Sequence, residues 1–421
     1  MGTVIIGGGI IGVSIAFYLS ETLEDSTSIH IVESSSRLFA SASGYAAGFL
    51  AKDWFSLGAA ELGALSFELH KKLADNNNGS EKWGYAPSTA LSLAIQEGVG
   101  VGTGARGEDW LLNGTSRAEV SAGHDVVNED GTPAWLTKQK SGSLDVISSE
   151  DGCAQVDPLR LCEFMMEACR TRGVQVHYPA KVVSLCKDDE GSLIGVNLVS
   201  DGGNVPSEIT CKAIVIASGA WTPAVFKNLF HKSTVSIPVS PLAGYSLLVR
   251  SPRHSVLDEQ KYGRSHAIFS APTQTYSWAP EIFSRTGGEI YIAGLNDPRL
   301  PLPEQATGAI MQHESMTEVK KVAVQLMGRV ASMRDAVAEN DLEVIREALC
   351  FRPVTDRGTP IITRVPDSSL GRGTKTPHDG GVFVAAGHGP WGISLSLGTG
   401  KVVAEMIRGE KTSADISRLG L

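Results

Sequence analysis

The sequence predicts a mixed α/β fold in which a doubly wound parallel sheet is interrupted by antiparallel strands. Residues 3–33 have the pattern strand, glycine-rich turn, helix and strand, which opens a doubly wound sheet. Further apolar strands followed by glycine-rich turns occur near the middle and the end of the chain. Between about residues 237 and 300, short alternating runs are separated by Pro and Gly, as in an antiparallel sheet.

Local patterns predict the individual elements. Thr3–Ile6 and Ile29–Val32 are short β-branched runs, as in buried parallel strands. Asp157 can cap a helix that starts at Pro158, extends to Arg172 and ends at Gly173. The other expected helices cover residues 11–19, 57–73, 315–327 and 398–408. The other expected strands cover residues 174–177, 181–185, 213–217 and 381–386.

Composition excludes several classes of function. The net charge is −9 and no run of Lys or Arg occurs, so we expect no nucleic-acid partner. The six cysteines have no CxxC pair and no metal-type spacing, so we expect neither a disulfide framework nor a metal site. No apolar stretch is long enough for a transmembrane segment. With no basic region before the first apolar run, a cytoplasmic protein is expected.

The N-terminal turn has the pattern of a dinucleotide site. Gly7, Gly9 and Gly12 fit G-x-G-x-x-G between a strand and a helix, an arrangement that brings backbone close to a pyrophosphate. Ile10 and Ile11 open the helix, whose N-terminal amides would face the phosphates. Glu33 follows Gly12 by 21 residues and would accept the ribose hydroxyls.

The number of glycine turns favours FAD as the dinucleotide. No second fingerprint follows the first, and FAD is a long molecule that lies across several strand ends. Two later turns that follow apolar strands would supply the other close approaches. The residues expected to contact FAD there are Ser218, Gly219 and Trp221 in the first turn, and Gly387, Gly389, Pro390, Trp391, Gly392 and Ile393 in the second.

Together these segments resemble the D-amino-acid-oxidase-like superfamily of FAD-dependent oxidoreductases, which includes glycine oxidase and monomeric sarcosine oxidase. The matching segments are the fingerprint, Glu33 and residues 40–50, 217–221, 349–362 and 385–400, whereas nothing is recognised over residues 80–150. Residues 280–297 and the turn at 387–392 are similar to a fungal branch of oxidoreductases.

The resemblance implies a glutathione-reductase-like FAD-binding domain and a discontinuous, antiparallel substrate domain. We expect residues 1–80, 151–235 and 340–421 in the FAD-binding domain. Residues 81–150 and 236–339 would then form the substrate domain. The order of parallel and antiparallel patterns along the chain agrees with this division.

The implied chemistry is oxidation of a C–N bond in a small amine or amino acid. Hydride would pass to flavin N5, and O2 would reoxidise the flavin and give hydrogen peroxide. One alternative is an FAD-dependent dehydrogenase with another electron acceptor. Another is a flavin-stabilised trafficking or scaffold protein with vestigial activity. The sequence leaves the oligomeric state open.

The resemblance also assigns residues near the flavin. Arg352 matches the arginine that binds the substrate carboxylate, although it could instead be tied structurally to Asp356. Cys350 matches the cysteine that the sarcosine-oxidase branch bonds to the flavin, with simple core burial as the alternative. Further cofactor contacts are expected from Ser41, Ser43, Gly44, Ala47, Gly48 and Val182.

The sequence departs from the family at the last glycine turn. Glycine oxidase has a second arginine there, whereas this chain has Trp391, which would form an aromatic wall of the substrate pocket. Tyr245 and His266 lie in the antiparallel region that should cover the flavin. Both are candidate catalytic residues, with ordinary sheet packing as the alternative. The missing second anchor supports the scaffold alternative.

Overall fold

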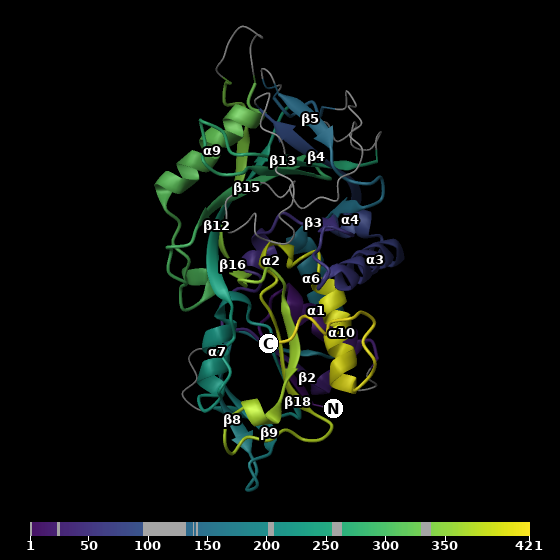
Figure 1. The fold of residues 1–421 in the computed structure, drawn as a ribbon, viewed down its shortest axis with the longest axis vertical. Coiled ribbons are helices and arrows are strands. Elements are labelled where there is room, and N and C mark those ends of the chain that lie inside the picture. The colour runs from purple at the N-terminus through teal and green to yellow at the C-terminus, as the bar shows by residue number, and fades with distance from the viewer. Residues whose placement is uncertain are drawn as a thin grey trace.

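The structure is a computed structural model that describes residues 2–22, 26–95, 132–137, 139, 142–200, 206–254, 263–329 and 338–421. Figure 1 shows a six-stranded sheet in its lower part and a larger, mostly antiparallel sheet in its upper part. A three-stranded sheet lies beside the first. The predicted mixed α/β fold is therefore confirmed.

The six-stranded sheet is parallel except at one edge, where β17 pairs antiparallel with β18. Its strand order is β17-β18-β11-β1-β2-β7. Every residue of β1, β11 and β18 is buried, which explains their uninterrupted apolar sequences. The bounds are β1 (Thr3–Ile6), β2 (Ile29–Val32), β7 (Gln175–His177), β11 (Ala213–Ile216), β17 (Ile361–Val365) and β18 (Gly381–Ala386).

Each face of this sheet has its own hydrophobic core. Helix α1 contacts both α6 and α10 within one core, and α3 packs on α10 to extend it. Helix α7 and the three-stranded sheet β10-β9-β8 form the other. The helices are α1 (Ile10–Ser20), α3 (Ala60–Asn77), α6 (Pro158–Thr171), α7 (Thr222–Leu229) and α10 (Ser396–Arg408). The strands are β8 (Ala180–Lys187), β9 (Leu193–Ser200) and β10 (Ser207–Thr210).

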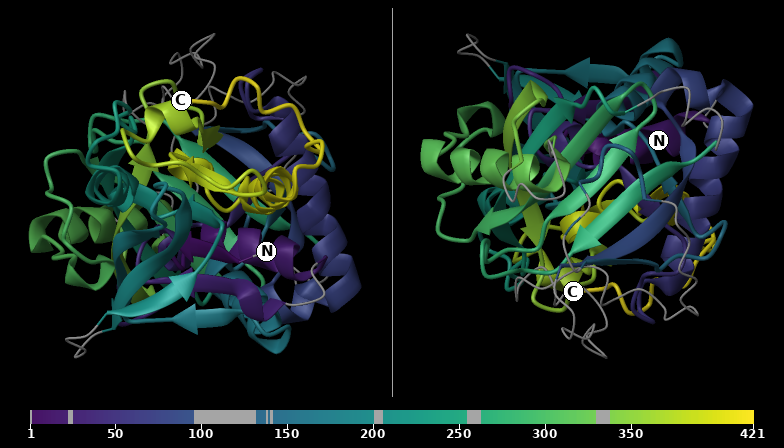
Figure 2. Two further views of the ribbon diagram at one scale, coloured as in Figure 1. Left: turned by 90° about the horizontal axis from the view of Figure 1, so that it is seen from below. Right: turned by 90° about the horizontal axis from the view of Figure 1, so that it is seen from above.

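The large sheet has nine strands, in the order β16-β12-β15-β14-β13-β4-β6-β3 with β5 paired to β4. Helix α9 (His313–Met327) packs on β12 and β15. Figure 2 shows α9 on one side of this sheet and the N-terminal helices on the other. The bounds are β3 (Phe49–Ala51), β4 (Ala86–Ala94), β5 (Ser143–Val146), β6 (Cys153–Gln155), β12 (Ser240–Arg250), β13 (Ser265–Ser270), β14 (Glu281–Arg285), β15 (Glu289–Asp297) and β16 (Glu343–Val354).

The sheets do not follow the predicted domain segments everywhere. Strand β16 lies in the segment expected for the FAD-binding domain, yet it pairs with β12 along almost its whole length. Strands β3 and β6, expected in the same domain, also join the large sheet. Hydrogen bonding explains this, because their N–H and C=O groups need partners and the large sheet supplies them. Residues 96–131 of the predicted substrate domain lie outside the described residues.

Helix boundaries follow the local signals where caps are present. Asp157 accepts hydrogen bonds from the backbone N–H groups of Leu159 and Arg160 at the start of α6, as predicted. Gly173 follows its end with a φ of 100°, a conformation that suits glycine. Helix α3 begins at Ala60, three residues later than predicted, because Leu57 lies in a turn and is 79% exposed.

The described residues contain three helices that local patterns did not predict, α2 (Ala42–Tyr45), α4 (Gly79–Trp83) and α7. In the part of the chain that the structure describes, no helix combines the length and apolar character needed to span a bilayer.

Candidate active site

A cavity of about 560 Å³ lies between the carboxyl ends of the parallel strands and the large sheet. The turns that follow β1, β2, β11 and β18 line one side of it. Strands β14, β15 and β16 line the other. Ligands of doubly wound sheets bind at the carboxyl ends of the strands, so this cavity is the candidate active site.

Glycine is needed at each of the three fingerprint positions for a different structural reason. Gly7 has a φ of 119°, and a Cβ there would lie 2.4 Å from the Ala217 carbonyl oxygen. A Cβ on Gly12 would lie 2.0 Å from the Gly7 carbonyl oxygen, so Gly12 allows α1 to pack on the turn. Gly9 lines the cavity, and its nearest neighbour would be Ser43 Oγ at 3.0 Å. Gly9 is therefore the glycine that leaves room for a ligand.

Backbone amides hold the carboxylate of Glu33 at the cavity. Gly8 N donates to one carboxylate oxygen at 2.9 Å, and Ser35 N donates to the other at 2.8 Å. Glu33 lines the cavity at the end of β2. Its orientation is fixed before any ligand arrives, which suits the predicted contact with ribose hydroxyls.

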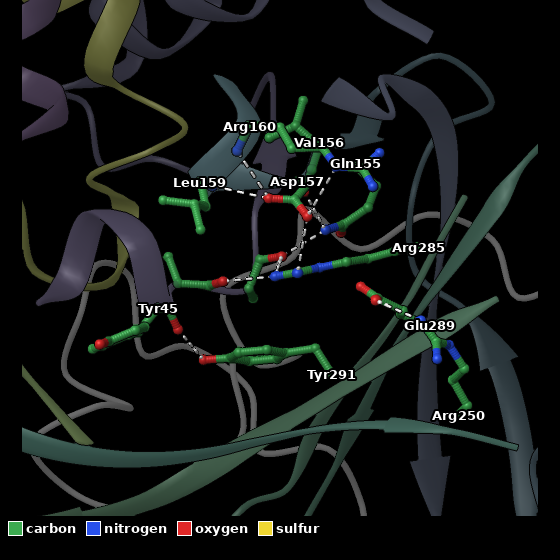
Figure 3. Close-up of polar contacts among 12 residues, drawn as sticks. Tyr45, Gln155, Val156, Asp157, Leu159, Arg160, Arg250, Arg285, Glu289 and Tyr291 are labelled. Atoms are coloured by element: carbon green, nitrogen blue, oxygen red, sulfur yellow. Dashed lines mark hydrogen bonds and ion pairs between the residues drawn. The ribbon is translucent and has the colours of Figure 1, made fainter. Parts of the chain in front are cut away.

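A loop at residues 45–48 is tied to the large sheet through its carbonyl oxygens. Tyr291 Oη donates to the Tyr45 carbonyl at 3.0 Å, and Arg285 donates to the carbonyls of Ala46 and Ala47 at 2.9 and 3.2 Å (Figure 3). Gly48, with a φ of 91°, accepts from Val156 N at 3.0 Å. Residues 46–48 line the cavity, so these bonds position its wall.

Arg285 is the centre of this arrangement. It is 3% exposed, and it forms an ion pair with Asp157 at 3.5 Å in addition to its two carbonyl contacts. Burial lowers the pKa of Arg285, and Asp157 partly counteracts that effect. The guanidinium nevertheless stays charged, and it links strand β14, the 46–47 loop and the start of α6 (Figure 3).

Arg352 reaches the cavity from β16. Its Nη1 donates to Asn296 Oδ1 at 2.6 Å. The guanidinium also packs against Gly244, where a Cβ would lie 1.7 Å from Nη1. Among the described residues it makes no ion pair with a carboxylate, and none joins it to Asp356. Its partner is therefore a neutral amide, which leaves the positive charge available to an anionic ligand.

Cys350 lines the cavity two residues before Arg352 and is buried. Burial raises the pKa of the Cys350 thiol, and the nearby charges of Arg352 and Arg346 partly lower it.

Three predicted catalytic residues, Tyr245, His266 and Trp391, do not line the cavity. Tyr245 faces away from the cavity into the core beneath α9, where its oxygen accepts a hydrogen bond from Gln312 N at 3.3 Å. The strand pleat explains this, because its neighbour Gly244 faces the Arg352 side chain on the opposite side of the strand. His266 on β13 is not a lining residue, and burial lowers its pKa to about 4. Trp391 packs in the core against Phe55, with ring centroids 4.9 Å apart.

Most predicted cofactor residues do line the cavity. Besides those described above, these are Ile10, Ile11, Ser41, Ser43, Ala47, Val182, Ser218, Gly219, Trp221, Gly389, Pro390, Gly392 and Ile393. Gly12, Gly44, Gly387 and Trp391 do not. A Cβ on Gly44 would lie 2.3 Å from the Phe39 carbonyl oxygen, and one on Gly387 would lie 2.5 Å from Thr355 Cγ2. These glycines permit close packing around the site.

Several residues that line the cavity were not predicted from the sequence. Residues 302–306 line the cavity. Trp221 Nε1 donates to the Pro303 carbonyl at 2.7 Å, and Lys181 forms an ion pair with Glu304 at 3.6 Å. These contacts join distant parts of the chain, so no local pattern marks them. Glu281 and Tyr291 also line the cavity. Strand alternation could have indicated their common face, but only with the strand register known.

Comparison with known proteins decides the family. The family model of FAD-dependent oxidoreductases, named DAO, matches residues 3–406. The chain belongs to this family. Its predicted membership, its oxidoreductase class and its use of FAD are thereby confirmed.

Two yeast relatives match this FAD-dependent oxidoreductase over almost its whole length. C1F5.03c of Schizosaccharomyces pombe is 27% identical over 99% of this chain and 96% of its own length. TDA3 of Saccharomyces cerevisiae is 24% identical over 99% of this chain and 93% of its own. Their names describe them as oxidoreductases and give no substrate. A D-amino acid dehydrogenase of Vibrio vulnificus is 24% identical over 71% of this chain and 59% of its own length.

Solved structures show the same two-domain fold. Glycine oxidase from Geobacillus kaustophilus has a TM-score of 0.71 and 23% identity, covering 100% of this chain and 98% of its own. L-proline dehydrogenase from P. horikoshii has a TM-score of 0.69 and 16% identity, covering 99% and 96%.

The cavity of this family member fits FAD along its length. Glu33 and Val182 lie toward one end, the fingerprint turn lies in the middle, and residues 46–48 and Cys350 lie toward the large sheet. Gly9 leaves space where a pyrophosphate would approach α1. The residues present therefore match an extended dinucleotide.

Gly9→Val should give a folded protein that binds FAD about 10- to 100-fold more weakly, since overpacking of a close-fitting site costs about 1–3 kcal/mol. FAD titration followed by flavin fluorescence measures the affinity. Gly58→Val is the control, because a Cβ there meets only ordinary contacts at 3.5 Å or more. An unchanged dissociation constant for FAD in Gly9→Val would contradict the placement of the pyrophosphate.

Arg285→Met should lower the free energy of unfolding by roughly 3 kcal/mol, because Asp157 then loses its buried ionic partner. It should also reduce FAD retention, since two carbonyls of the 46–47 loop lose their donor. Denaturant titration with and without FAD measures both effects. The control is Arg299→Met, whose pair with Asp297 is exposed and should contribute little. Equal stability of the two variants would exclude the structural role of Arg285.

Proposed function

We propose that this FAD-dependent oxidoreductase oxidises a C–N bond in an amino acid or amine. The observation that carries the proposal is Arg352, which lines the cavity with a neutral amide as the hydrogen-bond partner of its guanidinium. A planar guanidinium binds a carboxylate through two parallel hydrogen bonds, which fixes both its position and its orientation.

Relatives and structural neighbours support this choice of substrate class. Glycine oxidase, iminodiacetate oxidase and L-proline dehydrogenase share the fold, and D-amino acid dehydrogenases share part of the sequence. The names of these proteins include both oxidases and dehydrogenases. We propose an oxidase that passes electrons to O2 and forms hydrogen peroxide, with another electron acceptor as the alternative.

The chain's own residues would mainly orient the substrate and exclude water. Bound FAD supplies an acceptor for the hydride that leaves the substrate α-carbon. Arg352 would hold the carboxylate, and the loop at 46–48, fixed by Arg285 and Tyr291, would form the wall beside the reacting carbon. Restricting the substrate to one reactive geometry supplies a large part of the rate.

Arg352→Lys should lower kcat/KM for amino acids by roughly 10- to 1,000-fold, because a lysine cannot form the paired hydrogen bonds. FAD content and the melting temperature should change little. Benzoate should perturb the flavin spectrum of the wild type and not that of the variant. The control is Arg299→Lys, whose side chain is exposed and outside the cavity.

The opposite result is also informative. If the wild type and Arg352→Lys oxidise simple amines equally well and neither oxidises amino acids, Arg352 has a structural role and the substrate lacks a carboxylate. If neither protein is reduced by any amine although both bind FAD, the alternative of a trafficking or scaffold protein with vestigial activity gains support.

Cys350 is proposed as the attachment point of the flavin, since it lines the cavity at the position of the cysteine in the sarcosine-oxidase branch. Acid precipitation should then leave the flavin with the protein, and mass spectrometry should find it on the peptide that contains Cys350. The Cys350→Ala variant should release its flavin into the supernatant. Complete release from the wild type would show that Cys350 is only packed nearby.

The proposal includes a cytoplasmic location. All six cysteines are free, which is typical of proteins in a reducing compartment. Fractionation of the native cells tests this directly.

A further inference from the structure

The side chain of Arg352 runs from β16 across β12 to β15. Its backbone lies opposite Leu242 of β12, and its Nη1 donates to Asn296 Oδ1 on β15 at 2.6 Å. Gly244 lies between the two ends, since it pairs with Asn296 on one side and with Cys350 on the other. A Cβ on Gly244 would lie 1.7 Å from Nη1, so the missing side chain opens the path that the guanidinium takes.

Asn296 is the only described residue that accepts a hydrogen bond from Arg352. Its amide oxygen fixes one end of the guanidinium without cancelling the positive charge. A guanidinium has five N–H groups, so its opposite edge can still form two parallel hydrogen bonds with a carboxylate. Arg352 is half-buried, and a cation in that position, held by a neutral partner, attracts an anionic ligand more strongly than it would in water.

The next residue on β15 shows how closely the strand register controls this charge. Asp297 pairs with Ala243 and therefore faces the opposite side of the strand. Its carboxylate accepts hydrogen bonds from the backbone and the side chain of Arg299, which lower the pKa of Asp297. A shift of one residue would place this carboxylate against Arg352 and neutralise the guanidinium.

We infer, on the basis of the proposed function, that Asn296 is a positioning residue for Arg352 and makes the cavity selective for a carboxylate. The amide of Asn296 orients the guanidinium, and Gly244 provides its path. Because this amide is neutral, the positive charge is left for the ligand, whereas a carboxylate at the same position would occupy it. The ligand is a carboxylate bound through both of its oxygens.

Flavin spectral titration of the FAD-loaded protein with benzoate and with benzamide tests the inference, because the two probes differ in charge and little in shape. Asn296→Asp should weaken benzoate binding by about 10- to 100-fold, since the new carboxylate competes for the guanidinium. Asn296→Ala should weaken it by about 2- to 10-fold, the effect of one neutral hydrogen bond. Benzamide binding and FAD content should stay close to those of the wild type.

Gly244→Ala is an independent variant that leaves the amide of Asn296 in place. Its Cβ would meet the end of the flexible Arg352 side chain rather than backbone. We therefore expect a folded protein that retains FAD and binds benzoate about 10-fold more weakly. The matched control is Asn197→Asp on β9, which makes the same chemical change outside the cavity lining, at an exposed hydrogen bond to Ser184. It should bind both probes as the wild type does.

Turnover separates positioning from a general structural role. Of glycine, sarcosine, D-alanine and L-proline, those that the wild type oxidises should show a KM about 10- to 100-fold higher in Asn296→Asp, with a small change in kcat. The reason is that the substrate carboxylate binds Arg352 in both the ground state and the transition state.

Two results would overturn the inference while leaving the proposed function in place. One is benzoate affinity that Asn296→Asp leaves unchanged, or that Gly244→Ala leaves unchanged if the first variant binds no FAD. The other is an equal loss of benzoate and benzamide binding, which would show a general change of shape. By contrast, a wild type that binds benzoate no more tightly than benzamide would refute Arg352 as the carboxylate anchor, and the proposed function would fail together with this inference.

Discussion

The buried guanidinium of Arg285 is the interaction on which the geometry of the site depends. It comes from the large sheet, yet its partners are the Asp157 carboxylate at the start of α6 and two carbonyls of the loop at 46–47. One side chain therefore connects the large sheet to the loop that lines the cavity. Tyr291 adds a second bond to the same loop. Because such buried contacts are costly to leave incomplete, the loop has little freedom to move relative to the sheet.

The charged groups that line the cavity differ between the end expected to bind the dinucleotide and the end expected to bind the substrate. At the dinucleotide end, Glu33 is held by backbone amides and Gly9 leaves space beside α1. At the sheet end, Arg352 offers a positive charge whose hydrogen-bond partner is a neutral amide. The first arrangement fits a ribose and a pyrophosphate, and the second fits a carboxylate. The proposed oxidation of an amino acid needs both.

The sequence predicted the parts of the site that depend on local backbone. The fingerprint turn and strands β1, β2 and β18 lie where their patterns indicated, because glycine spacing and β-branched runs act over a few residues. The packing of Tyr245 and Trp391 outside the cavity lining was not predicted, since pleat and packing decide which way a side chain points. Arg285 and the segment at 302–306 gave no signal, because their partners are distant in sequence.

The central claim is that an amino acid gives its hydride to the FAD in this cavity. The most direct measurement is anaerobic mixing of the FAD-loaded protein with a panel of amino acids and amines, followed by the flavin absorption band. The account predicts that an amino acid bleaches this band and that admission of O2 restores it with formation of hydrogen peroxide. Oxidised flavin that persists with every amino acid and every amine, although FAD is bound at unit stoichiometry, would contradict the account.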